Sequence, residues 1–395
     1  MVNKNKRIYL DYAATTPVDK GVLGAMAPYF SDKFGNPSSI HSFGQEAIAA
    51  VDSAREKIAK LLDCKFEEII FTGSATEANN LAIKGLIPNS CGRKSLGRTH
   101  IVSTNIEHES VLEPLKELKK LGHEITYLKV DKNGFIKISN LERAIKNNTI
   151  LVSVIYANNE IGTIQPIKKI GRLLEKINKK RQENNLPRIY FHTDAVQALQ
   201  FLECRPDWLK VDLMTFSGHK IYGPKGIGAL YVRKGTPLRP IILGGGQEFG
   251  LRSGTENVPY IVGFAKAVEL VFSAKGGSAI KNLRDKLWGY IIKNKGDVRL
   301  NGSFNNRLPN NLNIRFPGIS NESLLIALDR GGLAVSAGSA CSSGAMSTSH
   351  VLRAIGLTEC QSKESIRITI GKNTTEKEIR IAAEIITKII KTLKI

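Results

Sequence analysis

Asp212-Leu213-Met214-Thr215-Phe216 is a short apolar run, and Ser217-Gly218-His219-Lys220 follows it directly. The run has the length and composition of a buried strand, and the glycine after it favours a turn. In an open parallel sheet, functional groups collect on the loops at the carboxyl ends of the strands. Lys220 is therefore a candidate for a Schiff base with an aldehyde, and an ordinary surface lysine is the alternative.

Similar apolar runs recur on both sides of this stretch. They lie at residues 68–72, 100–103, 124–130, 150–155, 188–192 and 228–232. Helical patterns separate several of them, as at residues 78–84, 111–120 and 167–180. Apolar runs that alternate with helices predict an α/β fold with a mostly parallel sheet that helices cover on both faces.

The pattern changes after the last of these runs. Gly244-Gly245-Gly246 interrupts it, a long helical segment begins near Tyr260, and the remaining elements are shorter and more mixed. With 395 residues the chain also exceeds one average domain. We expect a large α/β domain at residues 15–258 and a smaller α+β domain at residues 259–395. Residues 1–14 are expected to pack with the smaller domain.

The composition is that of an ordinary globular protein, with 42% hydrophobic and 24% charged residues. No run approaches the roughly 20 apolar residues that span a bilayer, and the basic residues 1–7 lack the apolar stretch of a secretory signal. The five cysteines are odd in number and far apart, which argues against a disulfide framework or a zinc cluster. These features predict a cytoplasmic protein without a bound metal.

The net charge of +21 has two interpretations. One is a nucleic acid or an acidic protein as partner. The other is a lysine-rich composition spread over solvated helix faces, as at Lys168-Lys169 and Lys179-Lys180-Arg181. The second is favoured because no basic tract interleaved with aromatic residues stands out.

Three further loops follow predicted strands. The first, at residues 73–77, suits a phosphate through its backbone N–H groups and hydroxyls, and ordinary helix capping by Ser74 or Thr76 is the alternative. Asp194 is placed to hold a pyridinium nitrogen protonated, or to cap a following helix. His108 is placed to stack on a cofactor ring, or it has a structural role.

Two residues of the C-terminal half carry further chemistry. Cys341 lies among small residues in Ser339-Ala340-Cys341-Ser342-Ser343-Gly344, a context that predicts an exposed thiol on a loop. Arg367 lies in the strand-like stretch at residues 365–369, where its guanidinium suits a substrate carboxylate. A solvent-facing strand arginine is the alternative.

In their order along the chain, these motifs closely resemble the cysteine desulfurases of the NifS/IscS type, within fold type I of the pyridoxal-phosphate enzymes. The resemblance covers nearly the whole chain. It rests on residues 9–17, 35–41, 75–80, 158–162, 192–197, 217–226, 244–248, 252–257 and 338–341. One departure is Gly73-Ser74, where many members of the family have Ser-Gly.

The resemblance implies a role for each matching residue. Lys220 would form the Schiff base with pyridoxal 5'-phosphate, Asp194 would pair with its pyridine nitrogen, and His108 would stack on its ring. Gln197 would bond its phenolic oxygen. The phosphate would be held by Ala75, Thr76, Ser217 and His219, and by Thr255 of a neighbouring subunit, which implies a homodimer. Asn159 and Arg367 would bind the substrate carboxylate, and Cys341 would accept the sulfur.

The reaction implied is removal of sulfur from L-cysteine, which yields L-alanine and a persulfide on Cys341. The sulfur would then serve iron–sulfur cluster assembly, tRNA thiolation or both, through an acceptor protein that the sequence does not identify. The chain ends at Ile395, without the C-terminal extension by which some relatives dock an iron–sulfur scaffold. A selenocysteine lyase or another class V aminotransferase-fold enzyme is the nearest alternative, and a basic binding module, for instance for tRNA, is an alternative of another class.

Overall fold

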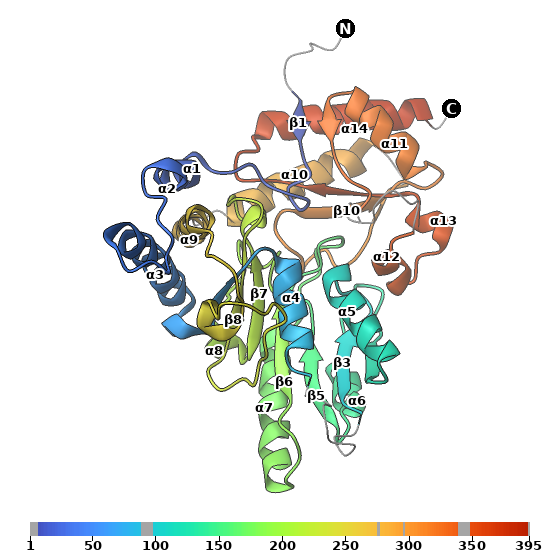
Figure 1. The fold of residues 1–395 in the computed structure, drawn as a ribbon. Coiled ribbons are helices and arrows are strands. Elements are labelled where there is room, and N and C mark those ends of the chain that lie inside the picture. The colour runs from blue at the N-terminus through green and yellow to red at the C-terminus, as the bar shows by residue number, and fades with distance from the viewer. Residues whose placement is uncertain (1–6, 88–97, 275–276, 295–296, 339–347, 394–395) are drawn as a thin grey trace.

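The computed structural model describes residues 7–87, 98–274, 277–294, 297–338 and 348–393. A seven-stranded sheet forms the centre of the larger part of the molecule (Figure 1). Its strands are, in spatial order, β2 (Ile69–Thr72), β8 (Gly228–Val232), β7 (Leu213–Ser217), β6 (Tyr190–Asp194), β5 (Thr149–Ser153), β3 (His100–Thr104) and β4 (Glu124–Leu128). All seven apolar runs noted in the sequence therefore contain strands, as predicted.

The sheet is parallel from β7 through β4, and β8 runs antiparallel to both of its neighbours. The short connection from β7 to β8 explains this exception. Residues 218–227 hold only the 3₁₀ turn η2 (Gly218–Lys220). A parallel connection needs a crossover of about a dozen residues or more, so the chain turns back instead.

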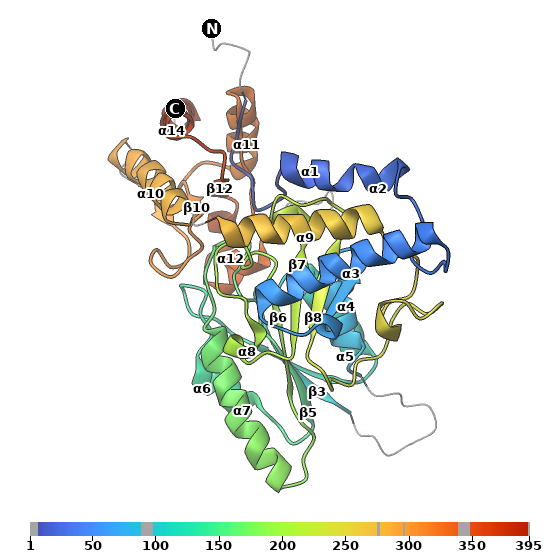
Figure 2. The same cartoon turned by 90° about the vertical axis from the view of Figure 1, so that its left-hand side faces the viewer.

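Helices cover both faces of this sheet because side chains alternate along each strand. On β2, Ile69 and Phe71 join one hydrophobic core, while Ile70 joins the other. The helices α4 (Ala75–Lys84) and α5 (Glu109–Lys120) pack on the Ile70 side. The opposite face is covered by α1 (Lys20–Met26), α3 (Ser42–Leu62), α6 (Ile138–Ala144), α7 (Ile167–Glu183), α8 (Pro206–Leu209) and α9 (Val258–Ser273) (Figure 2). The short helix α2 (Pro28–Ser31) follows α1 in the chain and packs against α9.

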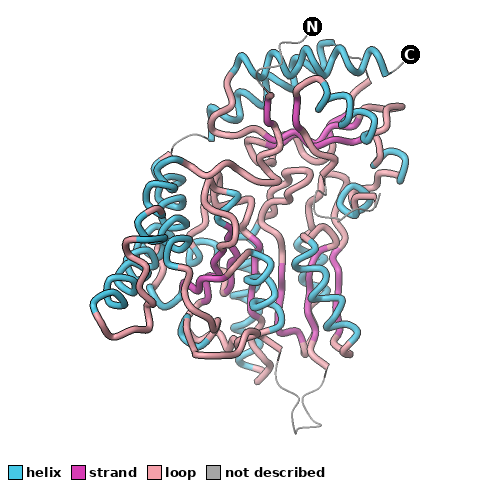
Figure 3. Tube along the Cα trace, turned by 45° about the horizontal axis from the view of Figure 1, so that its top comes forward, coloured by secondary structure: helices cyan, strands magenta, loops and turns pink. Residues whose placement is uncertain are grey.

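A second hydrophobic core is formed mainly by the C-terminal part of the chain. Its helices and strands gather at the end of the molecule where both termini lie (Figure 3). It is built on the antiparallel strands β9 (Arg299–Leu300), β10 (Asn311–Arg315) and β12 (Ser365–Thr369), and on the helices α10 (Gly277–Asn294), α11 (Asn321–Arg330) and α14 (Glu376–Leu393). The short helices α12 (His350–Ala354) and α13 (Glu359–Ser362) precede β12.

The N-terminal strand belongs to this second part. β1 (Ile8–Tyr9) pairs in parallel with β11 (Leu333–Ala334), and Leu10 is buried in the second core. By contrast α9, which starts at Val258, packs in the first core beside α3. The boundary near residue 258 stays a prediction.

Within the described part of the chain, no helix has both the length and the apolar character that crossing a membrane requires.

Candidate active site

A cavity of about 410 Å³ opens at the carboxyl ends of the central strands. Its lining includes ten of the residues singled out in the sequence. They are Ala75, Thr76, His108, Asn159, Asp194, Gln197, Ser217, His219, Lys220 and Arg367. Loops from β3, β5, β6 and β7 contribute to this set together with β12 of the smaller sheet, so the cavity lies where the two cores meet.

Lys220 ends the 3₁₀ turn after β7 and is partly buried, so it is not a surface lysine. Its Nζ donates hydrogen bonds to the backbone oxygens of Ala13, at 2.7 Å, and Ala14, at 2.8 Å. The Gln197 side chain donates to the same Ala13 oxygen over 3.0 Å. The segment after β1 thus lies directly against the lysine, a contact that the local sequence did not indicate.

His219, next to Lys220, is held in its neutral form. Burial and the positive charges of Lys220 and Lys225 lower the pKa of His219 to about 4. Its Nδ1 lies 3.2 Å from the Thr15 hydroxyl. At neutral pH this imidazole therefore acts as a hydrogen-bonding group and not as a cation.

Asp194 ends β6 and is only 5% exposed. Its Oδ2 accepts a hydrogen bond of 2.8 Å from Asn79 of α4, and its Oδ1 accepts one of 3.0 Å from the backbone of Val196. Residues 196–200 form turns, so the helix-capping alternative for Asp194 is wrong. Because Asp194 also lines the cavity, its buried carboxylate is placed to pair with a cationic group of a ligand there.

His108 and Ser74 both cap helices and both line the cavity. The His108 ring accepts from the backbone of Ser110 at the start of α5, and the Ser74 hydroxyl accepts from the backbone of Glu77 at the start of α4. The alternatives, helix capping by Ser74 and a structural role for His108, are therefore correct, and neither excludes ligand binding. Capping aims the first turn of α4, with Ala75 and Thr76, at the cavity.

Gly228 permits this arrangement of α4. A Cβ at this position would lie 2.8 Å from the carbonyl carbon of Ser74 and 2.9 Å from the nitrogen of Ala75. Any side chain at position 228 would therefore push the N-terminus of α4 away. The glycine allows a helix end, where an anion is favoured, to approach the sheet closely.

Arg367 lies on β12 and is only 2% exposed, which rules out the solvent-facing alternative. Its Nη1 donates to the backbone oxygens of Asn159, at 3.0 Å, and Gly338, at 2.9 Å. Its Nη2 donates to Asp11 over 2.9 Å, and its buried Nε has no partner among the described residues. Asp11 orients the guanidinium, and this role was not predicted.

Two predicted residues are not among those that line the cavity in the described part of the chain. Thr255 lines a separate, smaller cavity of about 190 Å³, which shares Gly226 and Ile227 with the first. Cys341 lies outside the described residues. Gly338, shortly before it, lines the main cavity, and so does His350, shortly after it.

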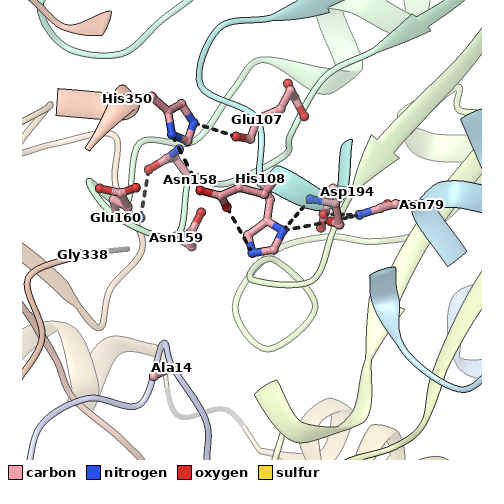
Figure 4. Close-up of polar contacts among 12 residues, drawn as sticks. Ala14, Asn79, Glu107, His108, Asn158, Asn159, Glu160, Asp194, Gly338 and His350 are labelled. Carbon is pink, nitrogen blue, oxygen red and sulfur yellow. Dashed lines mark hydrogen bonds and ion pairs between the residues drawn. The ribbon is translucent and has the colours of Figure 1, made fainter. Parts of the chain in front are cut away.

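The cavity also contains charged and polar groups that the sequence analysis missed (Figure 4). Glu160 is 1% exposed and accepts a 2.6 Å bond from the Ser349 hydroxyl, and burial raises its pKa. His350 Nε2 lies 2.9 Å from the backbone oxygen of Glu107. No local pattern marks these residues, because their hydrogen-bond partners lie far away in the chain.

Glu107 is a fully buried carboxyl group. Its Oε1 accepts bonds from the Thr104 hydroxyl, at 2.6 Å, and the Ile155 backbone, at 2.9 Å, whereas its Oε2 has no partner among the described residues. Burial raises the pKa of Glu107 to about 8. A buried carboxylate oxygen without a donor disfavours the charged form, which agrees with the raised pKa.

We expect Glu107→Gln to change how stability depends on pH. The unfolded chain releases the Glu107 proton near pH 4.5 and the folded protein near pH 8, so between these values rising pH destabilises the wild type. Relative to the variant, the free energy of unfolding of the wild type falls by up to about 1.4 kcal/mol per pH unit. Melting temperatures of both proteins from pH 5 to 9 measure it. Glu113→Gln, at an exposed position of α5, is the control, and a wild-type–variant difference that is constant with pH would contradict the prediction.

The groups in the cavity suit pyridoxal phosphate. An amine at Lys220 matches its aldehyde, the buried carboxylate of Asp194 matches its pyridine nitrogen, and the N-terminal turn of α4 matches its phosphate. The close approach that Gly228 permits is part of the same fit.

Comparison with known proteins supports this interpretation. The family described as "Aminotransferase class-V" matches residues 8–381. "Cysteine desulfurase IscS" of Dictyoglomus turgidum is 46% identical over 391 residues, which cover 98% of this chain and 96% of that protein. A solved "NIFS-LIKE PROTEIN" superposes with a TM-score of 0.89 at 38% identity, covering 98% of this chain and all 100% of the other. Another solved structure, "SspA in complex with cysteine", has a TM-score of 0.78 at 39% identity and covers 92% of this chain and 98% of its own.

These findings confirm the fold class and the resemblance expected from the sequence. The matches extend over nearly the full length of both partners, so the likeness is not confined to the cofactor-binding sheet. The chain belongs to the cysteine desulfurases, a pyridoxal-phosphate-dependent group within the class-V aminotransferase family.

Proposed function

We propose that this protein removes sulfur from L-cysteine, releases L-alanine and carries the sulfur as a persulfide on Cys341. The observation that carries the proposal is the convergence of Lys220, Asp194, His108 and Arg367 on one cavity. They come from four different elements and serve the cofactor and an amino-acid substrate together. The names of the relatives agree with this activity.

Cofactor binding is assigned to the residues around Lys220. Lys220 attaches pyridoxal phosphate covalently, Asp194 pairs with its pyridine nitrogen, His108 stacks on its ring and Gln197 bonds its phenolic oxygen. The phosphate lies against Ala75, Thr76, Ser217 and His219. When bound, the cofactor withdraws electrons from the substrate α-carbon and makes loss of its proton feasible.

Substrate orientation is assigned to Arg367 and Asn159. A guanidinium binds a carboxylate through two parallel hydrogen bonds, and burial strengthens this interaction. Arg367 is already held at both Nη atoms by groups of the protein, so its plane is set before the substrate arrives. With the carboxylate held there, Lys220 would act as the base that removes the α-proton.

Sulfur transfer is assigned to Cys341. Its thiolate attacks the substrate sulfur, the new S–S bond forms, and the C–S bond breaks with its electron pair left on the substrate carbon. Protonation of that carbon yields the methyl group, and return of a proton to the α-carbon completes L-alanine. The sulfur is then available to an acceptor protein of iron–sulfur cluster assembly or tRNA thiolation.

We further propose that the protein is a cytoplasmic homodimer, in which Thr255 reaches the cofactor phosphate of the partner subunit. Thr255 is exposed and lies in the smaller cavity, away from the Lys220 site of its own chain. Large apolar side chains nearby in the chain are also exposed, among them Leu243 at 81% and Phe249 at 51%. A second subunit that covers them would remove this apolar surface from water.

The test is the product formed from L-cysteine by purified protein loaded with pyridoxal phosphate. We expect L-alanine and protein-bound persulfide in equal amounts during the first turnover. An aminotransferase would instead convert the cofactor to its amine form without releasing alanine. Activity with L-selenocysteine and none with L-cysteine would show a selenocysteine lyase, and would contradict the proposal.

A further inference from the structure

Asn79 connects two groups of the cofactor site, although the sequence analysis assigned it no role. It lies on α4, is 0% exposed, and its Nδ2 is 2.8 Å from both Asp194 Oδ2 and Ser110 Oγ. Ser110 Oγ in turn is 2.9 Å from His108 Nδ1. Figure 4 shows this chain of contacts from Asp194 through Asn79 to His108.

The direction of each hydrogen bond in the chain follows from the chemistry of the groups. A carboxylate only accepts, so the amide nitrogen of Asn79, and not its oxygen, must face Asp194. The second N–H of the same nitrogen then donates to Ser110 Oγ. This orientation leaves Asn79 Oδ1 buried with no partner among the described residues. An unsatisfied buried acceptor is costly, so the two donations must outweigh it.

The same reasoning extends to His108. Because Ser110 Oγ accepts from Asn79, its own proton is left for His108 Nδ1. The backbone N–H of Ser110 also points at Nδ1, over 3.1 Å. Two donors at one ring nitrogen require that nitrogen to be unprotonated, which places the proton of the neutral ring on Nε2. Nε2 lies on the side of the Glu109 carboxylate, at 3.8 Å, where an N–H is favourable.

We propose that Asn79 and Ser110 are positioning residues that orient the Asp194 carboxylate and fix His108 as the tautomer protonated on Nε2. This inference rests on the proposed function, in which Asp194 and His108 contact the cofactor. The Asp194 carboxylate and the His108 ring are thereby coupled. The Asn79 amide nitrogen holds the carboxylate, and through the Ser110 hydroxyl it selects the ring tautomer.

The test is ¹⁵N NMR of histidine-labelled holoenzyme, in which only seven histidines give signals. In the wild type, the His108 signals should show an unprotonated, hydrogen-bonded Nδ1 and a protonated Nε2. In Ser110→Ala only the backbone N–H still donates to Nδ1, so Ser110→Ala and Asn79→Ala should both shift these signals part of the way toward a mixture of tautomers. Asn79→Ala should also change the absorption spectrum of the bound cofactor. Both should lower kcat by about 10- to 100-fold.

Two variants separate positioning from a general loss of structure. Ser110→Thr keeps a hydroxyl and should restore the wild-type His108 signals. Asn80→Ala removes the neighbouring amide on the same helix, which among the described residues donates to the backbone oxygen of Thr76 over 2.9 Å, and should change none of these readouts. Wild-type tautomer signals and cofactor absorption in both Ser110→Ala and Asn79→Ala would overturn the proposal.

The NMR measurement does not depend on turnover. Protein that forms no alanine from L-cysteine, yet shows the expected tautomer and its loss in Ser110→Ala, would contradict the proposed function and leave the positioning role intact. Protein that forms alanine, but whose His108 tautomer is the same in the wild type, Ser110→Ala and Asn79→Ala, would contradict the positioning role alone.

Discussion

Cys341→Ser should abolish persulfide formation and lower alanine formation from L-cysteine by at least about 1,000-fold, the scale on which loss of a nucleophile acts. A serine hydroxyl is not ionised at neutral pH, and its oxygen does not take over the sulfur as a persulfide. The cofactor should still bind, because the groups assigned to it are other residues, which line the cavity. Mass spectrometry of the protein after a single turnover, together with alanine measurement, reads out both effects.

The matched control is Cys360→Ser. Cys360 is an exposed thiol in α13, bonded only to Glu364 in the described structure, and its loss should leave persulfide and alanine at wild-type levels. Unchanged alanine formation in Cys341→Ser would show that the sulfur leaves without a thiol acceptor. The protein would then be a lyase.

Lys220→Ala should eliminate the covalent cofactor adduct and lower alanine formation by about 1,000-fold or more, since both the attachment and the base are removed. Pyridoxal phosphate should remain bound more weakly through Asp194 and the N-terminus of α4. The variant also loses the two hydrogen bonds from Nζ to Ala13 and Ala14. Borohydride reduction followed by mass spectrometry detects the adduct in the wild type.

Lys234→Ala, at an exposed position after β8, is the control and should retain both the adduct and the activity. If borohydride trapped the cofactor on another lysine in Lys220→Ala, with activity kept, the assignment of Lys220 would be incorrect. Loss of the adduct with wild-type alanine formation would separate attachment from catalysis.

Much of the fold could be predicted because its signals are local. The run at 212–216 and the six similar runs are strands, and the segments at 111–120 and 167–180 lie within α5 and α7. Burial on both faces requires an unbroken apolar run, and this pattern can be read without knowing the neighbours of a strand. The antiparallel direction of β8 was not predicted, although the ten residues between it and β7 leave too little chain for a parallel crossover.

The candidate site divides in the same way. Lys220, Asp194 and His108 each follow a predicted strand, so their placement at one edge of the sheet was predictable. The groups that hold them were not. Asp11 bonds Arg367 across 356 positions, and Asn79 bonds Asp194 across 115.

The sequence by itself therefore determined the elements, the family and most of the residues that line the cavity, because alternation and strand-end loops are properties of short segments. Only the tertiary structure decided which groups are buried and which of them pair. The sequence did not mark Glu107 at all, and it left Arg367 between a substrate-binding role and a solvent-facing position, whereas both are buried in the fold. Removal of water makes the direction and pairing of their hydrogen bonds energetically decisive, and packing between distant segments alone sets that burial.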